Sequence, residues 1–304
     1  VGQHNVSIWV NDTSGNENST SLTFTINSIY PKVDYGSITP INGSSTTNTS
    51  VELNFSIIED DLDEIKFNWN GTNYSVYDNS IVLMMNFDNI SSIGDNDSTS
   101  TDLSQYNNHG DLLGNAGYNI SGKYGSGLQL DGEDDYMNLS HTSSLNITGA
   151  ITISLWERTA DIDVTATWGM SIFGRGFYGD PRNTMDLRVR ATGDTAVFGY
   201  EYGSGANSDY AIGTTDITDG NWHHIVAQWN GTDCLVYVDG SYENSTSCPN
   251  APGPFDQGFV LGKSLNSSLE NQVDFNGSID ELIVWNRSLS AEEIYQQYPE
   301  MDFS

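Results

Sequence analysis

Strict alternation of apolar and polar residues predicts short β-strands in the first part of the chain. Residues 6–10 (VSIWV) and 21–26 (SLTFTI) alternate around the polar loop NDTSGNENST, which is the pattern of a β-hairpin. Residues 51–57 (VELNFSI) and 65–71 (IKFNWNG) alternate again on either side of an acidic loop, EDDLDE. Because an isolated hairpin is marginally stable in water, these strands have to dock on others.

From Ile81 onward the same kind of segment recurs about every ten to fifteen residues, with Gly, Asn and Asp between them. This spacing without intervening helices predicts an antiparallel two-sheet sandwich. One helix is expected at Ser290 to Tyr298, because Ser290 and Glu293 make a capping box and Pro299 ends the helix. The expected strands are 83–87, 127–131, 151–158, 185–190, 196–200, 223–229, 234–238, 259–263 and 278–285.

Length and charge narrow the function classes. The chain has 304 residues, enough for two units, and its 10 basic and 41 acidic residues give a formal net charge of -31. Such a charge repels phosphate backbones and anionic lipid, so we expect no nucleic-acid partner and regard membrane surfaces as poor partners. No apolar run approaches the roughly 20 residues of a membrane span. Since the first residue is Val1 and no leader precedes it, we expect a removed signal peptide or a longer parent chain.

Potential glycan acceptors are unusually frequent. The triplet Asn-Xaa-Ser/Thr occurs about eighteen times, where the Asn, Ser and Thr content alone accounts for about seven. Polar strands rich in these residues create some triplets by composition, but the excess favours a glycosylated, extracellular protein. The acceptor candidates are Asn5, Asn48, Asn70, Asn146, Asn230 and Asn276.

Cys234 and Cys248 are the only two cysteines, and they flank a predicted hairpin at Asp239-Gly240. In an oxidising compartment they form a disulfide that adds about 3 kcal/mol on the chain-entropy model; the alternative is two buried free thiols. A simple two-residue turn would not place the cysteines opposite one another. The connection is therefore expected to bulge or loop.

Six motifs follow one another in the larger part of the chain. They are DxSxxxNxG at 102–110, GKYGSGLQLDGEDDY at 122–136, ITISLW at 151–156, DGNWHHIV at 219–226, VYVDG at 236–240 and FNGSIDELIVWNRSLSAEEI at 275–294. In this order they resemble the landmarks of laminin G-like domains of microbial, more narrowly archaeal, surface proteins. The resemblance implies that residues 81–304 form a concanavalin A-like jellyroll.

These motifs also have a direct physical reading as residues that hold the fold together. Asp239-Gly240 supplies the positive φ angles of a tight hairpin, and Gly125 and Gly127 permit close backbone approach. Large indoles are expected in the core between the sheets rather than as an exposed sugar platform. These tryptophans are Trp156, Trp222, Trp229 and Trp285.

The N-terminal segments resemble immunoglobulin-like sandwiches of archaeal and bacterial surface proteins. Residues 1–30, with WVNDTSGN at 9–16, look like the closing hairpin of such a domain, and residues 31–80 look like its opening strands. The order is inverted relative to one normal domain. The hairpin either folds back on strands 51–71 as a circular permutation, completes the sandwich of a neighbouring subunit by strand addition, or belongs to a slice of a multi-domain chain.

The jellyroll resemblance implies a structural calcium ion, which requires several oxygen ligands. The implied ligands are Asp102, Asn107, Asn108 and Asp280. A second, weaker group is Asp131, Asp134 and Asp135.

No arrangement for catalysis stands out, although glucanases share the jellyroll. Their mechanism needs two carboxylates about 5 Å apart, and the matching string from Glu59 to Glu64 lies in a turn before the jellyroll begins. His223 and His224 are adjacent and point to opposite faces of a strand, and no GxSxG motif is present. We therefore expect no enzymatic activity.

The sequence thus predicts an all-β, extracellular, non-enzymatic cell-surface protein, with a jellyroll and a smaller immunoglobulin-like portion. The expected role is structural or adhesive, in oligomers or filaments joined head to tail by β-strand donation. The alternative is a calcium-dependent carbohydrate-binding module.

Overall fold

The structure, a computed structural model, divides the chain into two units, Val1–Ile65 and Lys66–Ser304. It describes residues 2–11, 13–26, 30–37, 39–47, 53, 55–59, 62–69, 71–160, 168–176, 184–202, 207–249, 257–263 and 272–298.

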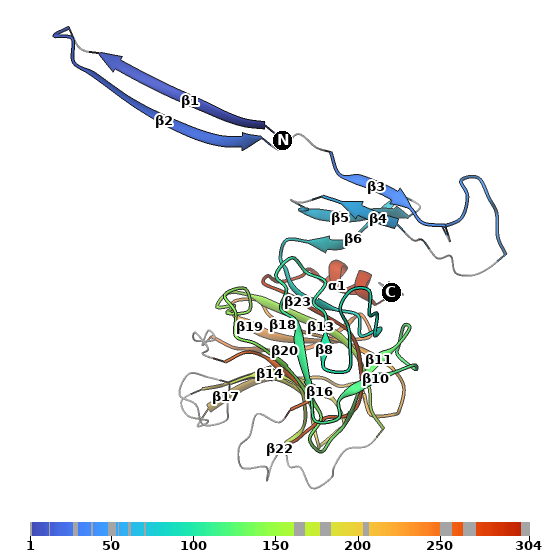
Figure 1. The fold of residues 1–304 in the computed structure, drawn as a ribbon. Helices are drawn as coiled ribbons and strands as arrows, with labels where there is room; N and C mark the ends of the chain where they lie inside the picture. Colours follow the sequence, from blue (N-terminus) through green and yellow to red (C-terminus); the bar gives the residue numbers. More distant parts are fainter. Residues whose placement is uncertain are drawn as a thin grey trace. The chain divides into compact units, whose positions relative to one another are not determined.

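The first unit holds two separate two-stranded sheets (Figure 1). β1 (Gly2–Asn11) and β2 (Glu17–Ile26) pair antiparallel over their whole length, which confirms the predicted hairpin. β3 (Lys32–Tyr35) pairs with β4 (Phe55–Ile58). Among the residues described, no strand pairing joins these two sheets. The immunoglobulin-like sandwich over residues 1–80 therefore stays a prediction.

Among the described residues, the strands predicted at 51–57 and 65–71 do not pair with one another. β5 (Glu64–Trp69) forms a hairpin with β6 (Thr72–Asp78) instead, and Gly71 turns between them with φ +90°. β6 belongs to the second unit, in which Arg287 forms a 2.7 Å ion pair with Asp78 at the end of the strand.

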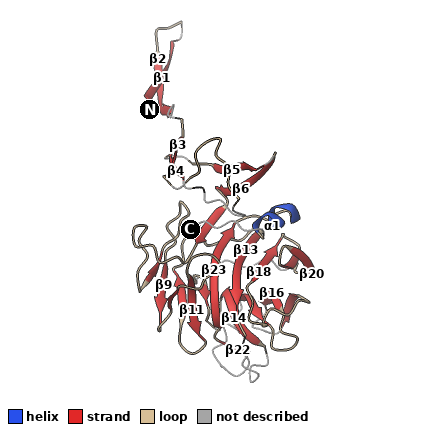
Figure 2. Cartoon of the chain, turned by 90° about the vertical axis from the view of Figure 1, so that its right-hand side faces the viewer, coloured by secondary structure: helices blue, strands red, loops and turns tan. Residues whose placement is uncertain are grey.

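The second unit is a β-sandwich of two layers, and nearly all of its secondary-structure elements are strands (Figures 1 and 2). In the described part of the chain its first layer, sheet I, runs in the order β10 (Gly117–Asn119), β11 (Gly127–Asp131), β23 (Asn276–Trp285), β13 (Ile151–Arg158), β18 (His223–Trp229), β19 (Asp233–Val238) and β20 (Ser241–Ser247), with β7 (Ile81–Met85) also on β23.

The second layer, sheet II, is antiparallel except for β22 (Gln272–Val273), which runs parallel to β14 (Gly169–Arg175). Its order, again among described residues, is β17 (Asn207–Ile212), β16 (Ala196–Tyr202), β15 (Thr184–Val189), β14 (Gly169–Arg175), β21 (Val260–Leu261), β12 (Tyr136–Leu139), β9 (Gly110–Leu113) and β8 (Thr99–Ser100).

Alternating side chains of the two sheets meet in one apolar core. Leu155 and Ile225 from sheet I and Leu187 and Phe198 from sheet II are all fully buried there. Period-two alternation sends the residues between them to the outer faces. The predicted double-sheet antiparallel jellyroll is thus confirmed.

The tryptophans correct one expectation. Trp229 belongs to the inter-sheet core. Trp156 is buried on the other face of sheet I, where its ring lies 5.8 Å from that of Tyr298. Trp222 is only half-buried, with the Arg158 guanidinium 4.9 Å from its ring. The sequence pattern indicated that the tryptophans hold the fold together, but it did not show on which side of a sheet each indole lies.

The predicted helix is α1 (Ala291–Gln297), and its capping box is confirmed. The Glu293 N–H donates to Ser290 Oγ at 3.2 Å, and the Ser290 N–H donates to Glu293 Oε2 at 2.7 Å. Ile294 is the buried residue of the helix. The described helix is neither long nor apolar enough to cross a membrane.

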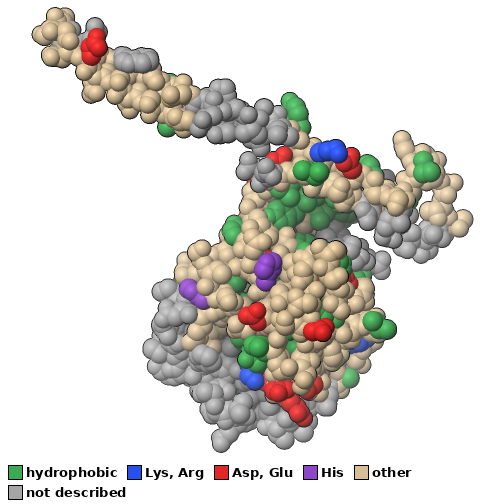
Figure 3. Space-filling view, viewed as in Figure 1, with side chains coloured by type: hydrophobic (Ala, Val, Ile, Leu, Met, Phe, Trp, Pro, Cys, Tyr) green, Lys and Arg blue, Asp and Glu red, His purple; other side chains and the backbone are tan. Residues whose placement is uncertain are grey.

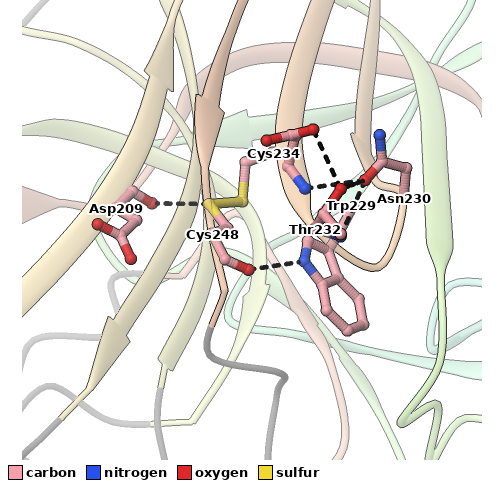
Figure 4. The surroundings of a disulfide bond; sticks show 7 residues. Asp209, Trp229, Asn230, Thr232, Cys234 and Cys248 are labelled. Atoms are coloured by element: carbon pink, nitrogen blue, oxygen red, sulfur yellow. Dashed lines mark hydrogen bonds between the residues drawn. A yellow bond between two sulfur atoms is a disulfide. The ribbon is translucent and has the colours of Figure 1, made fainter.

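A disulfide joins Cys234 and Cys248, whose Cα atoms are 5.7 Å apart (Figure 4). Asp239 and Gly240 both have positive φ, and a bulge between Val236 and Tyr237 shifts the register of β19 and β20. The expected bulge is therefore present. The bond closes the edge where β20 of sheet I lies against β17 of sheet II, because Cys248 Sγ is 3.5 Å from the Asp209 carbonyl oxygen.

Candidate functional site

The outer face of sheet II is polar although it is buried. Met185, Leu187 and Val189 of β15 face the core, so Asp186 and Arg188 face away from it. Only 2% of Asp186 and 8% of Arg188 are exposed. Buried charges of this kind need partners, because desolvation of an unpaired charge costs several kcal/mol, about the full stability of a domain.

The partners of Asp186 come from neighbouring positions on the same face. Ser171 Oγ donates to Asp186 Oδ1 at 2.9 Å, and Arg188 Nη1 donates to Asp186 Oδ2 at 3.0 Å. Both carboxylate oxygens therefore accept hydrogen bonds from sheet II. The arrangement fixes the Arg188 guanidinium on the face.

An aromatic ring completes the group. The Arg188 guanidinium carbon lies 4.2 Å from the centre of the Tyr210 ring, a cation–π contact, and Tyr210 Oη donates to Glu201 Oε1 at 2.8 Å. The ring needs Gly199 beside it, because a Cβ there would lie 2.7 Å from Tyr210 Cδ1 and 1.9 Å from the Asp209 carbonyl oxygen. We call Asp186, Arg188, Glu201 and Tyr210 the tyrosine cluster.

Burial and charge set the protonation of the tyrosine cluster. Burial raises the pKa of Glu201 and raises that of Tyr210 well above its usual value. Burial lowers the pKa of Arg188, but Tyr210 and Asp186 raise it by more, so the guanidinium stays charged. Arg188 Nε is buried and has no hydrogen-bond partner among described residues.

A second tyrosine lies on the same outer face, on β12. Met137 and Leu139 face the core, which places Tyr136 and Asn138 on the outside. Lys263 Nζ is 5.0 Å from the centre of the Tyr136 ring and 2.8 Å from Asp274 Oδ2. The face thus carries two tyrosines, each with a cation against its ring.

Sequence reasoning did not single out the tyrosine cluster. Alternation in MDLRVR places Asp186 and Arg188 on one side of a strand, but it does not show that Tyr210 and Glu201 lie beside them. That contact arises from the pairing of β15, β16 and β17, which the sequence does not display.

Asp102, the centre of the predicted calcium site, is held by the chain itself. Its carboxylate accepts the N–H groups of Met84, Ser104 and Asn108 at 2.9, 2.9 and 2.7 Å and the Ser104 hydroxyl at 2.7 Å. These four donors use the lone pairs that a cation would need. The geometry gives Asp102 the role of fixing the 102–108 turn to β7, and residues placed in this way do not fit calcium.

The other implied ligands are also engaged. Asn108 donates Nδ2 to the Val82 carbonyl at 2.7 Å and accepts the Thr142 hydroxyl at 2.7 Å, and Asn107 sits in a left-handed turn at φ 54°. Asp280 accepts the N–H groups of Lys123, Tyr124 and Glu281, so it holds a different loop from Asp102. Burial raises the pKa of Asp280 to about 8.

The second, weaker set of implied calcium ligands does lie close together in the structure. Carboxylate oxygens of Asp131, Asp134 and Asp135 lie within 4.8 Å of one another, with Asp131 and Asp134 exposed and Asp135 buried. Asp135 also accepts the N–H groups of Asn115 and Asp131, the latter at 3.2 Å. Among the described residues, no other group of three or more Asp, Glu, His or Cys side chains has its ligand atoms this close together.

The two histidines have separate partners on opposite faces of β18. His223 contacts Asp239 at 2.9 Å and Asp219 at 3.3 Å, and these carboxylates raise its pKa against the effect of burial. His224 Nε2 is 2.7 Å from Ser154 Oγ and fully buried, and burial lowers its pKa to about 4. Neither arrangement is a metal site or a catalytic triad.

The glycan acceptors differ in access. Asn5, Asn230 and Asn276 are exposed, and Asn146 is half-buried. Asn230 Oδ1 accepts the Thr232 hydroxyl at 3.0 Å within its own turn (Figure 4). Asn48 and Asn70 lie outside the described residues.

Structural comparison gives neighbours that are binding domains. The binding domain of Paraclostridial Mosquitocidal Protein 1 matches with a TM-score of 0.55 at 15% identity, over 72% of this chain and 52% of that one. The binding domain of Botulinum Neurotoxin DC in complex with SialylT matches with 0.53 at 14%, over 72% and 51%. The present chain thus spans about half the length of these toxin domains.

A third similar structure is domain 4 of AbnA, a GH43 extracellular arabinanase from Geobacillus stearothermophilus, in complex with arabinotriose. It matches with a TM-score of 0.53 at 20% identity, over 71% of this chain and 97% of that one. At these identities the likeness shows the fold alone. No curated protein matches the chain.

A family model matches residues 131–295, which is more than half of the chain and spans β12 to α1, including the tyrosine cluster. Two packed antiparallel sheets, the six ordered motifs and this match agree: the chain belongs to the laminin G-like family Laminin_G_3 of the concanavalin A-like lectin/glucanases superfamily.

Proposed function

We propose that this chain is a non-enzymatic, extracellular binding protein that recognises carbohydrate on the outer face of sheet II. The observation that carries the proposal is the tyrosine cluster, in which the Tyr210 ring lies 4.2 Å from the Arg188 guanidinium and Tyr210 Oη donates to Glu201 at 2.8 Å. Tyr210 is half-buried, so it is the accessible member of the cluster. Carbohydrate sites combine aromatic rings with a few fixed donors and acceptors for hydroxyl groups. The fold supports the proposal, since AbnA domain 4 is seen with arabinotriose.

The same face carries two carboxylates, Asp186 and Glu201, which is the residue type that glycosidases use in pairs. Here both oxygens of Asp186 accept hydrogen bonds from Ser171 and Arg188, and Glu201 accepts one from Tyr210. A nucleophile or acid held in this way is oriented toward its own sheet rather than toward a glycosidic bond. The contacts therefore support binding over hydrolysis.

The test is a glycan array followed by calorimetric titration of each oligosaccharide that binds. Tyr210→Ala is expected to weaken binding at least about tenfold, since an aromatic contact of about 1.4 kcal/mol corresponds to that factor. The matched control is Tyr242→Ala, an exposed tyrosine on the edge strand β20. Equal losses in both variants, or release of reducing sugar by the wild-type protein, would contradict the proposal.

A second proposal concerns the first unit. We propose that the chain also has a structural role, as a subunit that donates its β1–β2 hairpin to a neighbour. The hairpin supports this because its strands are ten residues long, pair only with each other among described residues, and expose apolar side chains. Concentration-dependent growth of oligomers in light scattering, and ordered polymers in negative-stain images, are the expected results. A strictly monomeric protein at all concentrations would contradict it.

We propose calcium as a structural cofactor at Asp131, Asp134 and Asp135 rather than at Asp102. Three carboxylates within 4.8 Å repel one another, and a hard divalent cation relieves that repulsion with the oxygen ligands it prefers. The ion would stiffen the turn between β11 and β12 and has no part in hydrolysis.

A further inference from the structure

The β1–β2 hairpin has one apolar and one polar face. Val6 pairs with Leu22, and Ile8 and Val10 follow on the same face by period-two alternation. These four side chains are 49% to 66% exposed. The opposite face is mainly polar, with Asn5, Ser7, Ser21 and Thr23, and its one aromatic position is Trp9.

The β3–β4 sheet has the same asymmetry. Val33 pairs with Ile57 and Tyr35 pairs with Phe55, which places all four on one face. Val33, Tyr35 and Phe55 are 40% to 74% exposed, and Ile57 is half-buried. The other face carries the Lys32–Asp34 ion pair and Ser56, with the exposed Ile58 as its one apolar residue.

Each face is therefore half of a sandwich core without its other half. Two-stranded sheets are marginal in water, and stacking two sheets face to face at about 10 Å is the usual way to bury such surfaces. Seven of the eight side chains that form the two faces are exposed, and only Ile57 is half-buried.

Charge indicates which molecule can cover them. The chain has a net charge of -31, so two copies repel one another over most of their surfaces. The twenty residues of β1 and β2 contain a single acidic residue, Glu17, at the turn end, and the residues named on the two apolar faces include no charged one. On the side of the hairpin seen in Figure 3, the described acidic side chains lie near the turn end. These two faces are thus where copies of this acidic chain can approach closely.

Building on the proposed donation of the hairpin, we propose that its acceptor is the β3–β4 sheet of a second copy. Val6, Ile8, Val10 and Leu22 of one copy pack face to face on Val33, Tyr35, Phe55 and Ile57 of the next. The two faces differ, so the contact is heterologous: every copy offers one donor and one acceptor, and the assembly grows head to tail.

The experiment uses two full-length variants with opposite defects. Ile8→Lys places a charge in the donor face and leaves the acceptor intact, and Val33→Glu does the converse. The control variants Ser7→Lys and Ser56→Glu place the same charges on the polar faces of the same strands. Size-exclusion chromatography with light scattering gives the mass of each species. Thermal melting shows that the jellyroll of every variant is folded, and the two control variants show that a charge as such does not disrupt the first unit.

Wild type and both controls are expected to form a ladder of oligomers. Ile8→Lys alone and Val33→Glu alone are expected to be monomers. An equimolar mixture of these two is expected to give a 1:1 dimer and nothing larger, because only one intact donor–acceptor pair remains.

Two other outcomes distinguish a wrong acceptor from a wrong assumption that the hairpin is donated at all. If Ile8→Lys is monomeric but Val33→Glu still forms the ladder, the hairpin is donated to a different surface, and the acceptor assigned here is wrong. If the wild type is monomeric and both variants lower the stability of the first unit, the hairpin folds back on its own chain, and donation itself is wrong.

Discussion

The two units of this chain follow the same alternating pattern and reach different outcomes. In the jellyroll, Leu187 of β15 is completely buried between two sheets, whereas Leu22 of β2 is 66% exposed on a two-stranded ribbon. Both leucines occupy the apolar side of a strand. The difference teaches that alternation specifies which face of a strand seeks cover, while the number of paired strands decides whether the chain supplies that cover itself.

The strongest challenge to this comparison is one substitution made in both units. Leu187→Ala is expected to lower the free energy of unfolding by about 2–5 kcal/mol, because it leaves a cavity in a packed core. Leu22→Ala is expected to change it by about 0.5 kcal/mol or less in the monomer. Urea denaturation followed by tryptophan fluorescence measures both. Similar losses would show that the hairpin is buried within its own chain.

Acid should weaken the jellyroll through His224. Its folded-state pKa of about 4 lies below the ordinary 6.5, so between these values only the unfolded chain binds the proton. Stability from this residue is therefore complete above pH 6.5 and falls by about 3 kcal/mol as the pH drops to 4.

The measurement is the difference in unfolding free energy between wild type and His224→Gln across this range, with exposed His141→Gln as the control. Taking the difference removes the contribution of Asp280, whose raised pKa acts in the opposite direction. A difference that does not vary with pH would show that His224 is solvated.

The disulfide offers a further contrast, because both cysteines of the chain lie in the jellyroll. Replacing Cys234 and Cys248 with alanine is expected to cost about 3 kcal/mol, since the bond closes a short loop in the unfolded chain. Oligomer formation through the hairpin should be unchanged. Loss of oligomers in this double variant would mean that the interface lies on the jellyroll.

The smallest expected effect is that of calcium. At ten times its dissociation constant, calcium should stabilise the jellyroll by about 1.4 kcal/mol, and magnesium should do less. Asp134→Asn should abolish the shift in melting temperature, whereas Asp97→Asn, in another acidic loop, should preserve it. A shift that survives Asp134→Asn and disappears in Asp102→Asn would restore the site implied by resemblance.

Much of the jellyroll could be predicted, for identifiable physical reasons. The bounds of β11, β13 and β18 coincide with expected strands because alternation or apolar runs end abruptly at turn residues. The helix could be placed because Ser290 and Glu293 satisfy its first N–H groups locally. Structural features that depend only on residues close together in the chain, such as a helix cap or a strand end, can be read from a sequence.

The candidate site could not be predicted, because it is made by contacts between strands. Tyr210 meets Arg188 only after β15, β16 and β17 have paired, and β14 and β17 were not recognised as strands. Asp102 is an intermediate case. Three of its four donors, from Ser104 and Asn108, lie in its own motif, and only the Met84 N–H comes from another strand.

The pairing of β7 with β23 has a mechanical consequence. Ile81, the first residue of β7, lies opposite Trp285, the last residue of β23. Tension applied between Ser80 and Asn286 would therefore break the hydrogen bonds of this pair one after another, rather than load them all at once. Arg287 lies at the end of the strand pair where separation would begin, and it donates hydrogen bonds to Asp78 at 2.7 Å and to Ser80 at 2.8 Å. Under such tension, the two bonds of Arg287 are expected to break before β23 separates from β7.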